Sequence, residues 1–231
     1  MRLTARDKLI IEVLQNQEFC FYKDICKNFF PSKSSASQSL KRLMQSGHII
    51  LEPAEKLNSH SFDDLSLSLF INNHFIVRLG DRHKLIKRET SSWRRKHQIL
   101  LFSVKERLES LLKEEAVFEI QIRELRNTLH NGKYEPLPDF FIKGESYKLA
   151  VELELNLKTQ NRYFQKMIDY RNSRFTHVLY VATHIKSLQR LAGTFRHRKY
   201  IAISHYSNVK EVISHRYGRQ TLIQWLKEET K

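Results

Sequence analysis

The segment YKLAVELELN, residues 147–156, constrains the fold of this chain more than any other. Residues 149–151 within it are all apolar, so both faces of this strand are expected to be covered, as in the interior of a sheet. Side chains on a strand alternate between its two faces. Glu152 and Glu154 therefore project from one face of a strand that is otherwise apolar. The segment predicts a central strand that carries two neighbouring carboxylates.

Strand and helix patterns alternate around this central strand. A long helix that includes Leu100 and Leu108 comes first, because apolar residues recur there at helical spacing. A turn built on Asn131-Gly132 separates the next two strands. Strands are expected over residues 116–125, 137–142, 147–156, 176–183 and, as the last one, 199–204; helices are expected over 159–172, 184–195 and part of 215–231. This α-β-β-β-α-β order predicts a mixed α/β domain.

The N-terminal part of the chain has a different pattern, with helical periodicity first and strands afterwards. Thr4 can cap the first helix, with Asp7 in its first turn. The third helix opens after Pro31 and ends at Gly47. Helices are expected over residues 4–16, 22–28 and 32–46, and strands over residues 48–52 and 74–80.

Three short helices followed by a two-stranded β-wing form the outline of a winged helix-turn-helix, in which the third helix enters the major groove of DNA. The outward face of this helix combines basic, hydroxyl and amide side chains and contains no acid, which suits hydrogen bonds to phosphates and base edges. The predicted DNA-binding residues on it are Lys33, Ser34, Ser35, Ser37, Gln38, Lys41 and Arg42. A small helical domain that binds a second copy or another protein is the alternative that these residues leave open.

The two patterns divide the chain into domains. We expect a winged-helix domain over residues 1–80, a basic linker over 81–91, and the mixed α/β domain over 92–231, which together give an α+β protein. The basic run WRRKH opens the first helix of the second domain. Its Arg94, Arg95 and Lys96 are candidates for contacts with the DNA backbone, and a solvated helix face is the alternative.

The chain carries a strong positive charge. Its 40 Lys and Arg against 25 Asp and Glu residues give a formal net charge of +15. Neutralising phosphates releases condensed counterions, so this charge favours a polyanion such as DNA as partner. An anionic membrane surface also fits the sign, although no apolar run is long enough to span a bilayer and no signal peptide is visible. We expect a cytoplasmic protein, without membrane insertion, whose Cys20 and Cys26 remain reduced.

Asp139 completes the acidic set. It lies one hairpin before the two glutamates, so its carboxylate can reach the same face. Neighbouring carboxylates on a buried strand repel each other and lose hydration, and a divalent cation offsets both costs. The sequence therefore favours Mg²⁺ or Mn²⁺ held by Asp139, Glu152 and Glu154. Alternating glutamates on a solvent-facing strand are the weaker alternative.

The dipeptide PD that ends at Asp139, followed by the ELE triplet of the central strand, resembles the motif of the PD-(D/E)xK nucleases, which have the restriction-endonuclease-like fold. The resemblance implies that Asp139, Glu152 and Glu154 are the metal-binding and catalytic acids. Glu154 stands where most members have a lysine, as in the ExE variant of the superfamily. Lys166 on the next helix is the first candidate for the catalytic lysine and Lys158 the second; a surface lysine is an equal alternative for either.

A winged helix joined through a basic helix to such a domain resembles the replication-relaxation proteins of mobile plasmids, and among them the MobC-type conjugative relaxases. The resemblance implies a metal-dependent enzyme that nicks one DNA strand at a plasmid transfer origin, and it leaves accessory mobilisation proteins open as partners. Two alternatives remain: a restriction or defence-type endonuclease that cuts both strands, and a non-catalytic DNA-binding regulator whose acids are structural. Water is the preferred nucleophile. Tyr163 and Tyr170 are the alternative, and a tyrosine would form a covalent link to DNA.

Overall fold

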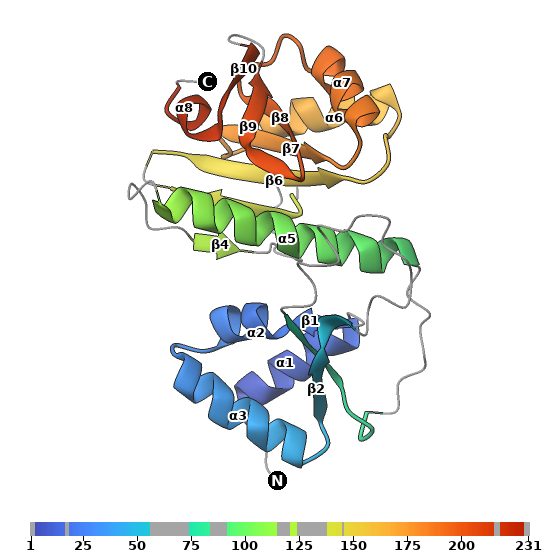
Figure 1. The fold of residues 1–231 in the computed structure, drawn as a ribbon, viewed down its shortest axis with the longest axis vertical. Helices are drawn as coiled ribbons and strands as arrows, with labels where there is room; N and C mark the ends of the chain where they lie inside the picture. The colour runs from blue at the N-terminus through green and yellow to red at the C-terminus, as the bar shows by residue number, and fades with distance from the viewer. Residues whose placement is uncertain are drawn as a thin grey trace. The chain divides into compact units, whose positions relative to one another are not determined.

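The protein folds into two compact units, each of which combines helices with a β-sheet (Figure 1). The first unit is Met1–Phe102 and the second is Ser103–Lys231. The structure is a computed structural model that describes residues 3–16, 19–55, 74–83, 92–114, 121–123, 138–144, 146–214 and 218–228. The chain is therefore a mixed α+β protein with two sheets.

The division between the units falls inside α5 (Ser92–Glu114). The sequence pattern places the domain boundary earlier, at the start of this helix, and residues 84–91 of the predicted linker lie outside the described residues.

Within its described residues, the first unit contains three complete helices, the beginning of α5 and a three-stranded antiparallel sheet of order β1-β3-β2. The elements are α1 (Ala5–Asn16), β1 (Cys20–Phe21), α2 (Tyr22–Phe29), α3 (Lys33–Gln45), β2 (Ile49–Pro53) and β3 (Phe75–Leu79). The three helices and the β2–β3 pair confirm the elements expected from the sequence. The short β1 is an addition.

Local side-chain contacts explain where these helices begin and end. The Thr4 backbone N–H donates to Asp7 Oδ2 (2.8 Å) and the Asp7 N–H donates to Thr4 Oγ1 (3.2 Å), which is the capping box expected from the sequence. The Ser32 hydroxyl caps α3 by accepting from the Ser35 N–H (3.3 Å). Gly47 follows α3 with φ of 71°, a left-handed conformation that favours glycine.

The second unit is built on a seven-stranded sheet of order β10-β9-β8-β7-β6-β5-β4. Its strands are β4 (Gln121–Arg123), β5 (Phe140–Lys143), β6 (Lys148–Glu154), β7 (His177–Ala182), β8 (Ile201–His205), β9 (Asn208–Ser214) and β10 (Gly218–Thr221), and its further helices are α6 (Gln160–Arg171), α7 (Ile185–Thr194) and α8 (Leu222–Leu226). β6 pairs antiparallel with β5 and parallel with β7, so it is an interior strand, as predicted.

Two expectations about this sheet need correction or fall outside the described residues. The strand predicted over 199–204 is not the last, because β9 and β10 continue the sheet beyond β8. The strand predicted over 116–125 is described only at β4, and the Asn131-Gly132 turn lies outside the described residues.

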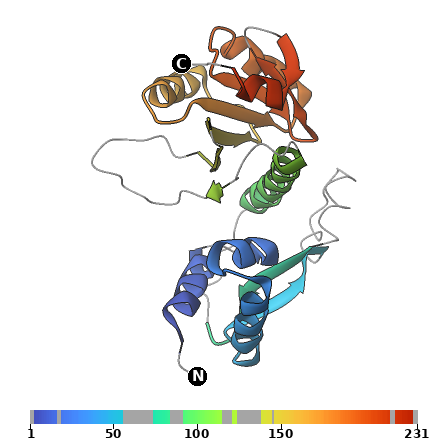
Figure 2. The same cartoon turned by 90° about the vertical axis from the view of Figure 1, so that its left-hand side faces the viewer.

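Helices cover both faces of the second sheet, and α6 and α7 cover the same one (Figure 1 and Figure 2). On that face the buried cluster comprises Ala150, Tyr163, Met167, Tyr170, Phe175, Val178, Tyr180, Ala182, Leu191, Phe195, Tyr200, Ile201 and Ile203. On the opposite face, the Trp225 ring of α8 packs edge-on against His177 of β7, with ring centroids 4.7 Å apart. Alternation along β6 places Glu152 and Glu154 on the same face as Ala150, under α6 and α7.

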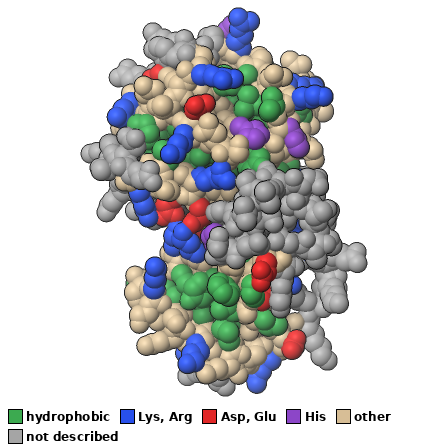
Figure 3. All heavy atoms as spheres, in the orientation of Figure 1, with side chains coloured by type: hydrophobic (Ala, Val, Ile, Leu, Met, Phe, Trp, Pro, Cys, Tyr) green, Lys and Arg blue, Asp and Glu red, His purple; other side chains and the backbone are tan. Residues whose placement is uncertain are grey.

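Lys and Arg side chains are scattered over the visible face of both units rather than collected in one patch (Figure 3). Among the residues that the structure describes, no helix combines the length and the apolar character needed to cross a membrane.

Candidate active site

Asp139 lies immediately before β5, beside the part of β6 that carries Glu152. Phe140 of β5 pairs with Val151 of β6 in antiparallel register. The Asp139 N–H donates to the Val151 carbonyl (3.1 Å), and Asp139 Oδ2 accepts from the Leu153 N–H (2.7 Å). These bonds hold the Asp139 carboxylate beside β6. The Asp139 charge also contributes, after burial, to the raised pKa of Glu152, so the two carboxylates are neighbours.

Glu152 is a buried carboxylate with both oxygens engaged. The residue is 3% exposed; Lys166 Nζ lies 2.6 Å from Oε2, and the Tyr170 hydroxyl donates to Oε1 (2.5 Å). Burial raises the pKa of Glu152, and the nearby Asp139 charge raises it further, while Lys166 and the two hydrogen bonds act in the opposite direction. Lys166 and Tyr170 are four residues apart on α6, so both reach the same carboxylate.

Glu154 has a lysine of its own. It is 1% exposed, and Lys158 Nζ lies 2.8 Å from its Oε1. The backbone N–H of Lys158 donates to the Tyr163 hydroxyl (3.1 Å). Burial raises the pKa of Tyr163 to about 12, and the Glu154 charge adds to this shift. The structure thus brings all the predicted catalytic residues of this domain into two neighbouring groups: Asp139, Glu152, Lys166 and Tyr170 in one, and Glu154, Lys158 and Tyr163 in the other.

Tyr180 of β7 is a residue of this site that the sequence reasoning missed. It pairs with Glu152 in the parallel register of β6 and β7. Its buried hydroxyl has no hydrogen-bond partner among the described residues. Burial raises the pKa of Tyr180 well above its ordinary value, and the charges of Glu152 and Glu154 add to the shift. The available signal was its hydroxyl within the apolar run VLYVA, on the strand after the acidic one.

The side chains of this site offer few ligands for a metal ion. Within the described residues, no group of three or more His, Cys, Asp and Glu side chains is arranged to hold a metal ion. Asp139 and Glu152 offer neighbouring carboxylates, and Mg²⁺ commonly takes one or two protein carboxylates with water and phosphate oxygens. Burial raises the pKa of Glu152 and the Asp139 charge adds to this shift; a cation would offset both effects. These two residues fit Mg²⁺ or Mn²⁺, which would take over the contact that Lys166 now makes with Glu152; Glu154 is paired with Lys158 in the same way.

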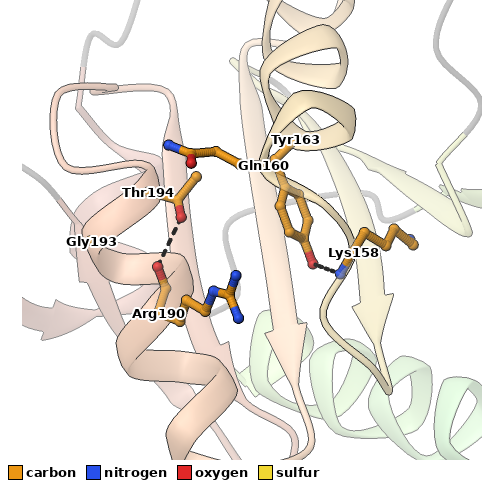
Figure 4. A pocket seen from close by; sticks show the side chains of 6 residues that line it. All are labelled: Lys158, Gln160, Tyr163, Arg190, Gly193 and Thr194. Atoms are coloured by element: carbon orange, nitrogen blue, oxygen red, sulfur yellow. Dashed lines mark hydrogen bonds between the residues drawn. The ribbon is translucent and has the colours of Figure 1, made fainter.

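A pocket of about 240 Å³ opens next to the Glu154 group, between the start of α6 and the last turns of α7 (Figure 4). It is lined by Lys158, Gln160, Tyr163, Arg190, Gly193 and Thr194. Lys158 and Tyr163 therefore belong both to the carboxylate site and to the pocket.

The predicted DNA-binding residues of α3 divide into two classes. Lys33, Ser34, Ser37, Gln38 and Lys41 are exposed, as predicted. Ser35 is half-buried and hydrogen-bonded within the cap of α3. Arg42 lies 2.5 Å from Asp7 Oδ2, and Asp7 is 1% exposed, so the structure gives Arg42 an ion pair between α1 and α3. Among the basic residues at the start of α5, Arg95 is half-buried, Lys96 is exposed, and the Arg94 side chain lies outside the described residues.

Comparison of the chain with protein-family models, with curated proteins and with solved structures finds no match.

Proposed function

We propose that this protein is a metal-dependent DNA endonuclease that nicks one strand, and that its site of action is a plasmid transfer origin. The observation that carries the proposal is that Asp139 lies beside Glu152, with the ammonium group of Lys166 on the second carboxylate. Two acids and a lysine under a covering helix are the parts that phosphodiester hydrolysis needs: anionic ligands for a cation, and a positive group for the developing charge.

The order of elements within each unit supports the proposed assignment of a winged helix and a restriction-endonuclease-like domain. In the first unit, three helices precede an antiparallel strand pair, which is the order of a winged helix. In the second, α5, three antiparallel strands, α6 and a parallel β7 follow one another in the order of a restriction-endonuclease-like core. The exposed residues of α3 would contact DNA, with Lys33 and Lys41 on phosphates.

Each residue of the site has a role in this proposal. Asp139 and Glu152 would hold Mg²⁺ or Mn²⁺, which would act as a Lewis acid toward the scissile phosphate. Lys166 neutralises Glu152 in the protein alone, and beside substrate it would stabilise negative charge on the phosphate. Glu154, held by Lys158, would orient the attacking water. The proposed nucleophile is water, since the Tyr170 hydroxyl is engaged with Glu152 and the Tyr163 hydroxyl with the Lys158 N–H, and burial raises the pKa of both phenols.

A second candidate function is a non-catalytic DNA-binding regulator. One observation favours it: Glu152 and Glu154 each have a lysine partner already, so both acids are accounted for as buried ion pairs. This candidate predicts DNA binding without cleavage, and binding that is indifferent to Glu152→Gln.

Incubation with supercoiled plasmid carrying the cognate transfer region, with Mg²⁺, Mn²⁺ or EDTA, separates these functions. The proposal predicts metal-dependent conversion to open circles. Linear product would point to a restriction or defence-type endonuclease that cuts both strands, and intact plasmid with DNA bound would point to the regulator.

A further inference from the structure

The pocket beside Glu154 has the chemistry of an anion site. Its lining includes the guanidinium of Arg190, the side-chain amide of Gln160 and the hydroxyls of Tyr163 and Thr194, and it includes no acid. Figure 4 shows Arg190 extending from α7 toward Tyr163, and Gln160 and Thr194 approaching each other from the two helices. Donors from two helices therefore surround the same space.

Arg190 is the cation of this pocket that is ready to bind a ligand. Lys158 is engaged with Glu154, whereas the exposed guanidinium of Arg190 forms no ion pair within the described part of the chain. A guanidinium presents a planar set of donors that matches the oxygens of a phosphate.

The size of the pocket limits its occupant. A volume of about 240 Å³ lies below the roughly 300–1,000 Å³ of sites that enclose a whole small molecule. It suits a phosphate with part of its sugar, while the rest of the ligand lies outside. A polymer that places one backbone unit in the pocket meets this condition.

We propose that this pocket binds a backbone phosphate of the DNA strand next to the phosphate that is cleaved. The inference rests on the proposed function, which supplies the identity of the ligand. Lys158 and Tyr163 belong to both sites, so the pocket lies beside the carboxylates. A strand fixed there is held on one side of the reacting phosphate. Arg190 is the residue that determines its position.

Calorimetric titration with thymidine bisphosphate, inorganic phosphate and thymidine tests this pocket. EDTA is present throughout, so the binding measurement does not depend on whether the protein has metal-dependent activity. Arg190→Gln is compared with Lys186→Gln, which removes the same charge from an exposed position of α7 outside the pocket. Gly193→Met fills the pocket without changing charge, because a Cβ at Gly193 meets no atom within 4 Å.

The inference predicts that thymidine bisphosphate binds the wild-type protein. Arg190→Gln should weaken its binding by roughly tenfold or more, as expected for the loss of a charge-assisted hydrogen bond. Gly193→Met should weaken the binding by roughly tenfold or more because the new side chain fills the pocket. Lys186→Gln should leave the binding unchanged. Equal losses in Arg190→Gln and Lys186→Gln, or no binding to the wild type, would overturn the inference. Inorganic phosphate bound as tightly as thymidine bisphosphate would overturn its claim that the pocket takes a nucleic-acid phosphate.

Discussion

At the scale of single residues, the carboxylate of Glu152 depends on two partners from α6. A buried charge without partners costs several kcal/mol, and here the ammonium group of Lys166 and the hydroxyl of Tyr170 offset that cost. Burial still leaves the pKa of Glu152 above its ordinary value of 4.5. The folded protein therefore binds a proton at Glu152 more readily than the unfolded chain does, and this contribution to stability is lost as pH rises through the raised pKa.

Lys166→Met should make this pH dependence steeper. Without the lysine, the pKa of Glu152 in the folded protein rises further. The variant therefore loses most stability at high pH, where Glu152 is ionised in the unfolded chain but is costly to ionise in the folded protein. We expect a loss of about 3 kcal/mol near pH 8 and a smaller loss near pH 5, measured by urea unfolding. Lys186→Met on α7 is the control and should be nearly neutral at both. Equal losses of the Lys166 variant at the two pH values would contradict the assigned ion pair.

Two buried tyrosines beside Glu152 should respond differently to loss of their hydroxyls. Tyr170→Phe removes a donor to a buried carboxylate and should destabilise the protein by about 1–3 kcal/mol. Tyr180→Phe removes a buried hydroxyl that has no partner among the described residues, so it should be neutral or stabilising. Thermal unfolding of the two variants measures the difference. Similar losses in both would show that the Tyr170 hydrogen bond contributes nothing.

At the scale of elements, α3 combines a face for packing with a face for a partner. Ala36, Leu40 and Leu43 are buried in the core of the first unit, while Lys41 is exposed. Arg42 belongs to the packing side, since its guanidinium pairs with the buried Asp7 of α1. Neighbouring basic residues of one helix thus have different roles.

Lys41→Gln and Arg42→Gln should separate these roles. If α3 contacts DNA, Lys41→Gln should weaken DNA binding, reduce the magnitude of the slope of log affinity against log salt by about one, and leave stability unchanged. Arg42→Gln leaves Asp7 without its cation and should lower the free energy of unfolding by about 2 kcal/mol. Fluorescence anisotropy with duplex DNA and urea unfolding measure the two quantities. Arg42→Gln with normal stability and weakened DNA binding would instead support the original assignment of Arg42 to the DNA interface.

At the scale of the whole molecule, periodicity in the sequence predicted most elements of both units and the acidic strand at the centre of the second. The interior position of β6 follows from the apolar run at residues 149–151, and the shared face of Glu152 and Glu154 follows from alternation. β9 was missed because Asn208, Lys210 and Glu211 are exposed, which hides the strand pattern.

Contacts between distant residues could not be predicted from local patterns. The ion pair of Asp7 with Arg42 joins two helices, and nothing in either helix indicates it. The partners of Lys166 and Lys158 depend on how α6 lies over the sheet. The sequence placed three acids in one metal site, whereas the structure engages Glu152 and Glu154 with separate lysines.

The central claim, that Asp139 and Glu152 form a catalytic pair, is tested most directly by the rate of nicking of supercoiled plasmid carrying the transfer region in Mg²⁺. Asp139→Asn and Glu152→Gln should each lower the rate by about 100-fold while DNA binding persists. Asp169→Asn changes an acid of α6 that Gln165 contacts, outside the carboxylate site, and should retain the wild-type rate. Equal rates in the wild type and in the Asp139 and Glu152 variants would contradict the claim.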